Sequence, residues 1–173
     1  MAKENANGTK KSGVLWIVAA AVVVVVAVIV TVFPKGKAGS ATNGAETLSA
    51  GENLVIQTAD VTETASFYPV NIDGTEMEVL AIRDSEGKIR TAFNTCQSCY
   101  TSGNGRYAAE GNELICQNCG FHFSADEVGI ETGGGCNPWP ITEGDKIVTE
   151  DTIEISYEFL AASKNIFANW GSH

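Results

Sequence analysis

Residues 91–141 of this 173-residue chain read TAFNTCQSCYTSGNGRYAAEGNELICQNCGFHFSADEVGIETGGGCNPWPI, and this stretch decides how the sequence is interpreted. It contains all five cysteines of the chain: Cys96, Cys99, Cys116, Cys119 and Cys136. Within each of the first two pairs, two residues separate the thiols, so both sulfurs can reach one ion from a tight turn. We expect each pair to lie at the tip of a β-hairpin. Together, the two pairs would then complete a tetrahedral metal site.

Other interpretations of the paired cysteines remain open. They could form two disulfides, act as a redox-active dithiol, or be buried apolar side chains. Export to an oxidising compartment would favour disulfides. A bridge within one Cys-x2-Cys pair, however, closes too small a loop to stabilise much, and Cys136 would be left over. We therefore favour a metal centre, and four thiolates suit zinc, a single iron or an iron–sulfur cluster.

Two further residues are candidates for additional metal or redox roles. Cys136 follows three glycines and precedes Asn137 and Pro138. A fifth thiol there could replace a ligand, relay electrons or accept an incoming metal ion, or it could be a buried small apolar residue. His122 follows Cys119 by three residues, within range of the site. Its alternation with neighbouring phenylalanines instead favours a half-buried, hydrogen-bonded histidine on a strand.

The rest of the C-terminal region predicts a mainly β fold. Short segments rich in β-branched and aromatic residues predict strands over residues 54–58, 67–72, 77–83, 88–93, 112–116, 145–150 and 152–159. The turn sequences IDGTE and DSEGK separate the early strands and predict hairpins. Residues 158–170 predict one short terminal helix. The strand spacing indicates a small sandwich or open barrel.

The N-terminal region predicts a membrane anchor. Residues 14–33, VLWIVAAAVVVVVAVIVTVF, contain one polar residue, and a helix of that length spans about 30 Å, the thickness of a bilayer core. The apolar part of a cleaved signal peptide is usually shorter, about 7–15 residues, so we expect an uncleaved transmembrane helix. Lysines before this segment favour a short cytoplasmic segment over residues 1–13. Residues 34–51 then predict a flexible linker, and residues 52–173 an extracytoplasmic metal-binding β domain.

Composition excludes several function classes. Eleven basic and 21 acidic side chains give a net charge of −10, which argues against binding nucleic acid. The two histidines, His122 and His173, leave little scope for histidine acid–base catalysis. No catalytic triad, H-E-x-x-H motif or phosphate-binding loop is present in the sequence. We expect a metal-binding or electron-transfer protein rather than a catalyst.

The order of strand, cysteine pair, hairpin, second pair and Pro-containing loop resembles the Rieske domain, in which two hairpin loops hold a two-iron cluster. The resemblance implies a small Rieske-like or open-barrel β domain. Cys99 and Cys119 stand where that pattern has histidines. A cluster held by four thiolates here would therefore have a lower reduction potential than a Rieske centre.

A closer resemblance covers residues 52–167. The motifs SEGKIRTAF, C-x2-C-Y, C-x2-C-G and GGGCNP are similar to those of the FtrD-like family of membrane iron–sulfur proteins. The resemblance implies that Cys96, Cys99, Cys116 and Cys119 are the ligands. It also implies an iron–sulfur cluster as the cofactor, and a membrane iron permease or a redox protein as the partner.

Two functions follow from these features. The first is a membrane-anchored extracytoplasmic iron–sulfur or iron protein that transfers electrons or handles iron for a membrane iron-transport system. The alternative is a structural-zinc interaction domain of a membrane complex. Lys10 and Lys11 stand where a signal for export of a folded, cluster-loaded protein would have twin arginines. This difference favours a centre loaded after export, which would be zinc or a single iron.

Overall fold

A five-stranded sheet forms one side of the main core. Its strands follow the order β10 (Pro138–Ile141), β6 (Ile89–Cys96), β5 (Thr75–Arg83), β4 (Ser66–Ile72) and β2 (Glu46–Leu48). Strands β4 and β5 form the hairpin that IDGTE predicts, because Asp73 and Gly74 both adopt positive φ, +51° and +83°. Two positive-φ residues match the right-handed twist of the flanking strands.

A four-stranded sheet completes the main core. It has the order β1 (Lys37–Ala38), β3 (Leu54–Gln57), β12 (Thr152–Ile155) and β11 (Lys146–Val148). Fully buried Ile56 and Ile153 of this sheet belong to the same apolar cluster as Val70 and Val79 of the five-stranded sheet. The C-terminal segment adds Leu160 to that cluster.

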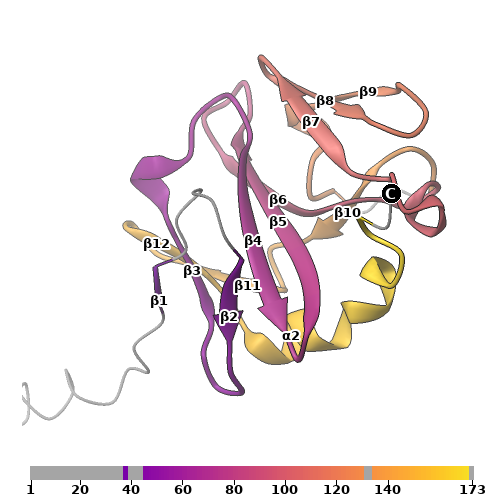
Figure 1. Ribbon diagram of the computed structural model, residues 1–173. Helices are drawn as coiled ribbons and strands as arrows, with labels where there is room; N and C mark the ends of the chain where they lie inside the picture. Colours follow the sequence, from indigo (N-terminus) through magenta and orange to yellow (C-terminus); the bar gives the residue numbers. More distant parts are fainter. Residues whose placement is uncertain (1–36, 39–44, 131–133, 172–173) are drawn as a thin grey trace, which may run out of the picture. The chain divides into compact units, whose positions relative to one another are not determined.

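A separate antiparallel sheet contains the second cysteine pair. It consists of β7 (Tyr107–Glu110), β8 (Glu113–Cys116) and β9 (His122–Ser124), and it lies beside β6 and β10 in Figure 1. A second buried cluster joins this sheet to β5 and β6 through Leu80, Ile82 and Leu114. Three cysteines, Cys96, Cys99 and Cys116, belong to this second cluster.

Among the residues that the structure describes, five short helical segments complete the fold. The α-helix is α2 (Tyr157–Ala162), and the 3-10 helices are η1 (Thr58–Asp60), η2 (Tyr100–Ser102), η3 (Ala125–Glu127) and η4 (Lys164–Phe167). The Ser156 hydroxyl caps α2 by accepting the Phe159 N–H at 3.2 Å. This cap ends the predicted strand of residues 152–159 at Ile155 and starts the helix one residue before the predicted position. The expected single terminal helix is divided, because α2 ends before η4 begins.

The structure is a computed structural model that describes residues 37–38, 45–130 and 134–171. Over these residues the predicted mainly β fold is confirmed. Part of the expected linker is ordered, since β2 pairs in parallel with β4 and Leu48 is buried. Within the described ranges, no helix has the length and apolar character needed to cross a bilayer. The segments expected to be cytoplasmic and transmembrane, residues 1–13 and 14–33, lie outside those ranges.

Candidate metal centre

Four cysteine sulfurs converge where the three-stranded sheet meets the five-stranded sheet. The Sγ atoms of Cys96, Cys99, Cys116 and Cys136 all lie within 4.8 Å of one another. Cys96 and Cys116 are the last residues of β6 and β8, and Cys136 precedes β10. The two Cys-x2-Cys pairs therefore approach one point in space although they leave different sheets.

The first pair lies on a tight turn after β6. The Cys99 N–H donates to the Cys96 carbonyl at 3.1 Å, and the Cys96 N–H donates to the Gly105 carbonyl at 2.7 Å. The Cys96 sulfur accepts hydrogen bonds from the backbone N–H groups of Ser98 and Cys99. These donors point at the sulfur, which is the geometry that stabilises a thiolate.

The second pair repeats this turn between β8 and β9. The Gly120 N–H donates to the Cys116 carbonyl at 2.8 Å, and Gly120 has a φ of +71°, which a glycine adopts without strain. The Cys116 sulfur accepts hydrogen bonds from the backbone N–H groups of Asn118 and Cys119. Both pairs thus hold their first sulfur in the same way.

The expected pair of hairpins is only half correct. The second pair lies in the β8–β9 hairpin, as expected. The first pair instead connects β6, which pairs with β5 and β10, to β7, which pairs with β8. The chain changes sheets at Cys96, so the first turn is a crossover rather than a hairpin tip.

Cys136 and Cys119 are neighbours at the edge of the site. The Cys136 sulfur lies 3.9 Å from that of Cys99 and 2.7 Å from that of Cys119. Cys119 is exposed and Cys136 is partly exposed, whereas the other three cysteines are buried. The structure therefore brings three of the four predicted ligands, Cys96, Cys99 and Cys116, together with Cys136, and the fourth, Cys119, lies beside Cys136.

His122 lies outside this group of sulfurs. Its Nδ1 atom is 2.8 Å from a carboxylate oxygen of Glu113, and 54% of its side chain is exposed. The contact between His122 and Glu113 joins two adjacent strands, because Glu113 belongs to β8 and His122 to β9, and these strands pair antiparallel. An imidazole held at the surface by Glu113 does not reach the sulfurs in this conformation.

The comparisons with known proteins agree with this geometry. Residues 48–167 match the family described as "Membrane iron-sulfur containing protein FtrD-like". The chain belongs to the FtrD-like family. Neither a curated protein nor a solved structure matches the chain. Thiolate sulfur is the preferred ligand of iron–sulfur centres, so the donor type in this FtrD-like protein agrees with the family description.

Burial and crowding oppose the ionisation of the clustered thiols. Burial raises the pKa of Cys116 to about 12, and the nearby Cys119 and Cys96 sulfurs add to this effect. Burial also acts against ionisation of Cys96, but hydrogen bonds from the Tyr107 hydroxyl and from the backbone outweigh it and lower the pKa of that thiol. Several thiolates can share so small a volume only if a cation offsets their charge.

Tyr107 is a site residue that the spacing of the cysteines does not reveal. Its side chain is buried, its hydroxyl donates to the Cys136 carbonyl at 2.7 Å, and it also hydrogen-bonds the Cys96 sulfur. Its backbone N–H donates to the Asn94 side chain at 2.6 Å. Tyr107 thus links β7 to both the first cysteine pair and the Cys136 loop.

Aromatic residues cover part of the centre. Phe123 is 4% exposed and packs in the same cluster as the cysteines, while neighbouring Phe121 is 54% exposed. Tyr100 and Trp139 meet edge to face at 5.6 Å between ring centroids and pack against the main core. Phe123 therefore shields the buried cysteines, whereas Tyr100 and Trp139 pack on the main core and Phe121 is exposed.

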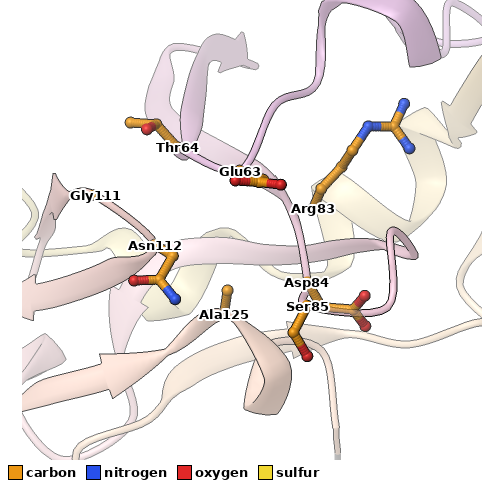
Figure 2. A pocket seen from close by; sticks show the side chains of 8 residues that line it. All are labelled: Glu63, Thr64, Arg83, Asp84, Ser85, Gly111, Asn112 and Ala125. Carbon is orange, nitrogen blue, oxygen red and sulfur yellow. The ribbon is translucent and has the colours of Figure 1, made fainter.

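A polar pocket elsewhere in the protein offers no comparable chemistry. It has a volume of about 440 Å³ and is lined by the residues labelled in Figure 2, none of which is a cysteine. Figure 2 shows the Arg83 guanidinium directed away from Asp84. Arg83 instead donates to the carbonyls of Thr58, Val61 and Gly87. Arg83 and Asp84 of this pocket are therefore engaged in hydrogen bonds within the fold.

Proposed function

We propose that this FtrD-like protein is a membrane-anchored, extracytoplasmic iron protein that passes electrons for a membrane iron-transport system. The observation that supports this proposal most strongly is the convergence of four sulfurs within 4.8 Å, with three of those cysteines buried. Thiolate ligation and burial are the two features by which proteins set the potential of an iron centre. The family description adds the membrane and the iron–sulfur character.

The surroundings of the sulfurs favour electron transfer over catalysis. Bound iron would supply one-electron chemistry, while the protein would hold the ion and limit the access of water. The Cys119 sulfur is exposed and lies 2.7 Å from that of Cys136, so a redox partner could approach the centre without opening the fold. A membrane permease or an associated redox protein is the partner we propose.

The test is an absorption spectrum of the full chain, purified anaerobically in detergent, together with metal analysis. We expect iron and visible sulfur-to-iron charge-transfer bands that bleach with dithionite and return on reoxidation. A chain that binds iron but cannot be reduced and reoxidised would contradict the electron-transfer role. Protease accessibility of the C-terminal domain in intact spheroplasts tests the proposed topology, since an extracytoplasmic domain is digested without lysis.

A structural-zinc domain is the second candidate. Three of the cysteines belong to the apolar cluster that joins the three-stranded sheet to β5 and β6, so an ion there would stabilise the fold whatever its redox chemistry. A colourless protein with one zinc per chain and no reducible centre, even after iron is offered, would support this alternative.

A further inference from the structure

We infer that this site takes a single tetrahedral metal ion rather than a multi-iron cluster, with Cys96, Cys99, Cys116 and Cys136 as ligands. Cys119 is then an exposed fifth thiol that can exchange with Cys136. This inference rests on the proposed metal centre but concerns a separate property, namely how many ions the site holds and which sulfurs bind them.

The spacing of the sulfurs argues for one ion. Four sulfurs about 2.3 Å from a tetrahedral ion lie about 3.8 Å from one another. The Cys99 and Cys136 sulfurs are 3.9 Å apart, and every pair among the four lies within 4.8 Å. In a two-iron or four-iron cluster, thiolates on different irons point away from each other across the cluster, which requires wider spacing. The four sulfurs described here enclose room for one ion.

Cys119 and Cys136 cannot both be ligands in this conformation. Their sulfurs are 2.7 Å apart, well short of the tetrahedral edge of about 3.8 Å. They are not joined by a disulfide, since all five cysteines are free. The two thiols therefore compete for one corner of the tetrahedron.

The connections of Cys136 favour it as the ligand. Its carbonyl accepts the Tyr107 hydroxyl at 2.7 Å, and the next residue, Asn137, accepts the Gln97 N–H at 2.9 Å. Pro138 then pairs with Cys96 at the start of β10. The segment from Cys136 to Pro138 is thus fixed to both β7 and the first cysteine turn.

Cys119 is placed for exchange. It is exposed, its sulfur accepts a hydrogen bond from the Phe121 N–H, and that sulfur lies next to the competing thiol of Cys136. In the exchange, the incoming Cys119 thiol releases its proton and binds the ion, while the departing Cys136 sulfur takes up a proton. No electrons move, and the ion stays bound to the other three sulfurs throughout.

The iron and sulfide content of the reconstituted protein tests how many iron ions the site holds. The full chain is stripped of metal, reduced, and reconstituted anaerobically with ferrous iron, once alone and once with sulfide. We expect one iron per chain and no acid-labile sulfide under both conditions. Two or four irons with matching sulfide would overturn the single-ion inference, while leaving an electron-transfer role intact.

Three variants test the ligand assignment. Cys119→Ser should keep one iron per chain, with an unchanged charge-transfer spectrum. Cys136→Ser should lose iron at least tenfold faster, because the exposed Cys119 then provides the fourth sulfur. Ala108→Ser is the control: it adds a hydroxyl at an exposed position of β7, and its iron content and rate of iron loss should match those of the wild type. Loss of iron from Cys119→Ser, with no change in Cys136→Ser, would overturn the assignment.

These results separate the two proposals. A wild-type chain that binds one iron but shows no reversible reduction disproves the electron-transfer role and supports the single-ion site. A wild-type chain that binds neither iron nor zinc after reconstitution disproves both. Circular dichroism of each variant checks that lost iron reflects a lost ligand rather than an unfolded chain.

Discussion

A single glycine shows how closely the backbone is packed under the first cysteine pair. A Cβ atom at Gly105 would lie 2.7 Å from the carbonyl oxygen of Cys99 and 2.8 Å from its carbonyl carbon. Both neighbours are backbone atoms of the turn that holds the sulfurs, so neither can move without moving a ligand. Sequence reasoning does not identify this glycine, because its role depends on contact with a turn six residues earlier.

Gly105→Ala should therefore disturb the metal centre more than an ordinary glycine substitution. Overpacking of this kind costs about 1–3 kcal/mol of unfolding free energy, and we expect weaker iron retention as well. Gly144→Ala is the matched control, because a Cβ atom at Gly144 would lie 3.7 Å from its nearest neighbour, the Thr142 hydroxyl oxygen. Urea unfolding and chelator competition measure the two effects. Equal stability and iron retention in the two variants would show that the first turn tolerates the added methyl group.

A second residue-level prediction concerns acid stability. The buried Asp84 carboxylate accepts the Arg90 Nε–H at 2.7 Å and the backbone N–H groups of Lys88 and Glu86. Burial alone would raise the pKa of Asp84, but these hydrogen bonds outweigh it and lower the pKa below the usual value. The folded state therefore binds this proton less readily than the unfolded state, so the stabilisation is present above about pH 4 and declines in more acidic solution.

Asp84→Asn should lower the unfolding free energy at pH 7 by about 2 kcal/mol, through loss of charge-assisted hydrogen bonds. The difference from the wild type should shrink as the pH falls from 4 to 2. Urea unfolding at several pH values measures it, with Asp151→Asn as an exposed control. A difference that is constant across this range would show that the Asp84 charge does not contribute.

At the level of elements, the link between β6 and β7 determines whether the cysteine pairs meet. The Asn94 side chain accepts the Tyr107 N–H at 2.6 Å and donates to the Tyr107 carbonyl at 3.3 Å. Asn94 thereby makes the two backbone hydrogen bonds that a neighbouring strand would otherwise make to Tyr107, the first residue of β7. Both residues are buried, so water does not compete for these groups.

Asn94→Ala should leave two buried backbone groups of Tyr107 without this partner and lower the unfolding free energy by about 2 kcal/mol or more. It should also weaken metal retention, since Tyr107 contacts both cysteine segments. Asn112→Ala changes an exposed asparagine in the β7–β8 turn and should cost less than about 0.5 kcal/mol. Thermal unfolding of the metal-loaded chains compares them. Similar melting temperatures for the two variants would contradict a structural role for Asn94.

The sequence predicts the elements better than it predicts how they meet. The Asp73–Gly74 hairpin and the second cysteine turn depend on residues close in the chain, and their sequence signals are local. The place of Cys136 depends on β10 pairing with β6, more than 40 residues away, as Trp139 lies opposite Phe93. No local pattern encodes that pairing. For this reason, the sequence indicates the two pairs of ligands but not that Cys136 lies beside Cys119.

At the scale of the whole molecule, the two buried clusters differ in their dependence on metal. The cluster between the two large sheets contains no cysteine among its described members, whereas the cluster beneath the three-stranded sheet contains three. Without a cation, the second cluster must keep several thiols packed together with only apolar contacts and hydrogen bonds to hold them. Metal binding should therefore stabilise one part of the fold more than the other.

Removal of the metal should loosen the three-stranded sheet selectively. In hydrogen-exchange mass spectrometry, we expect amides of residues 96–124 to exchange roughly tenfold faster or more in the metal-free chain, because local opening no longer breaks metal–sulfur bonds. Amides of β3, β4 and β12 should exchange at nearly the same rate in both states, since their buried residues pack between the large sheets. Re-addition of the metal should restore protection. Uniform acceleration across all strands would instead mean that the two clusters unfold as one unit and that the metal stabilises the entire domain.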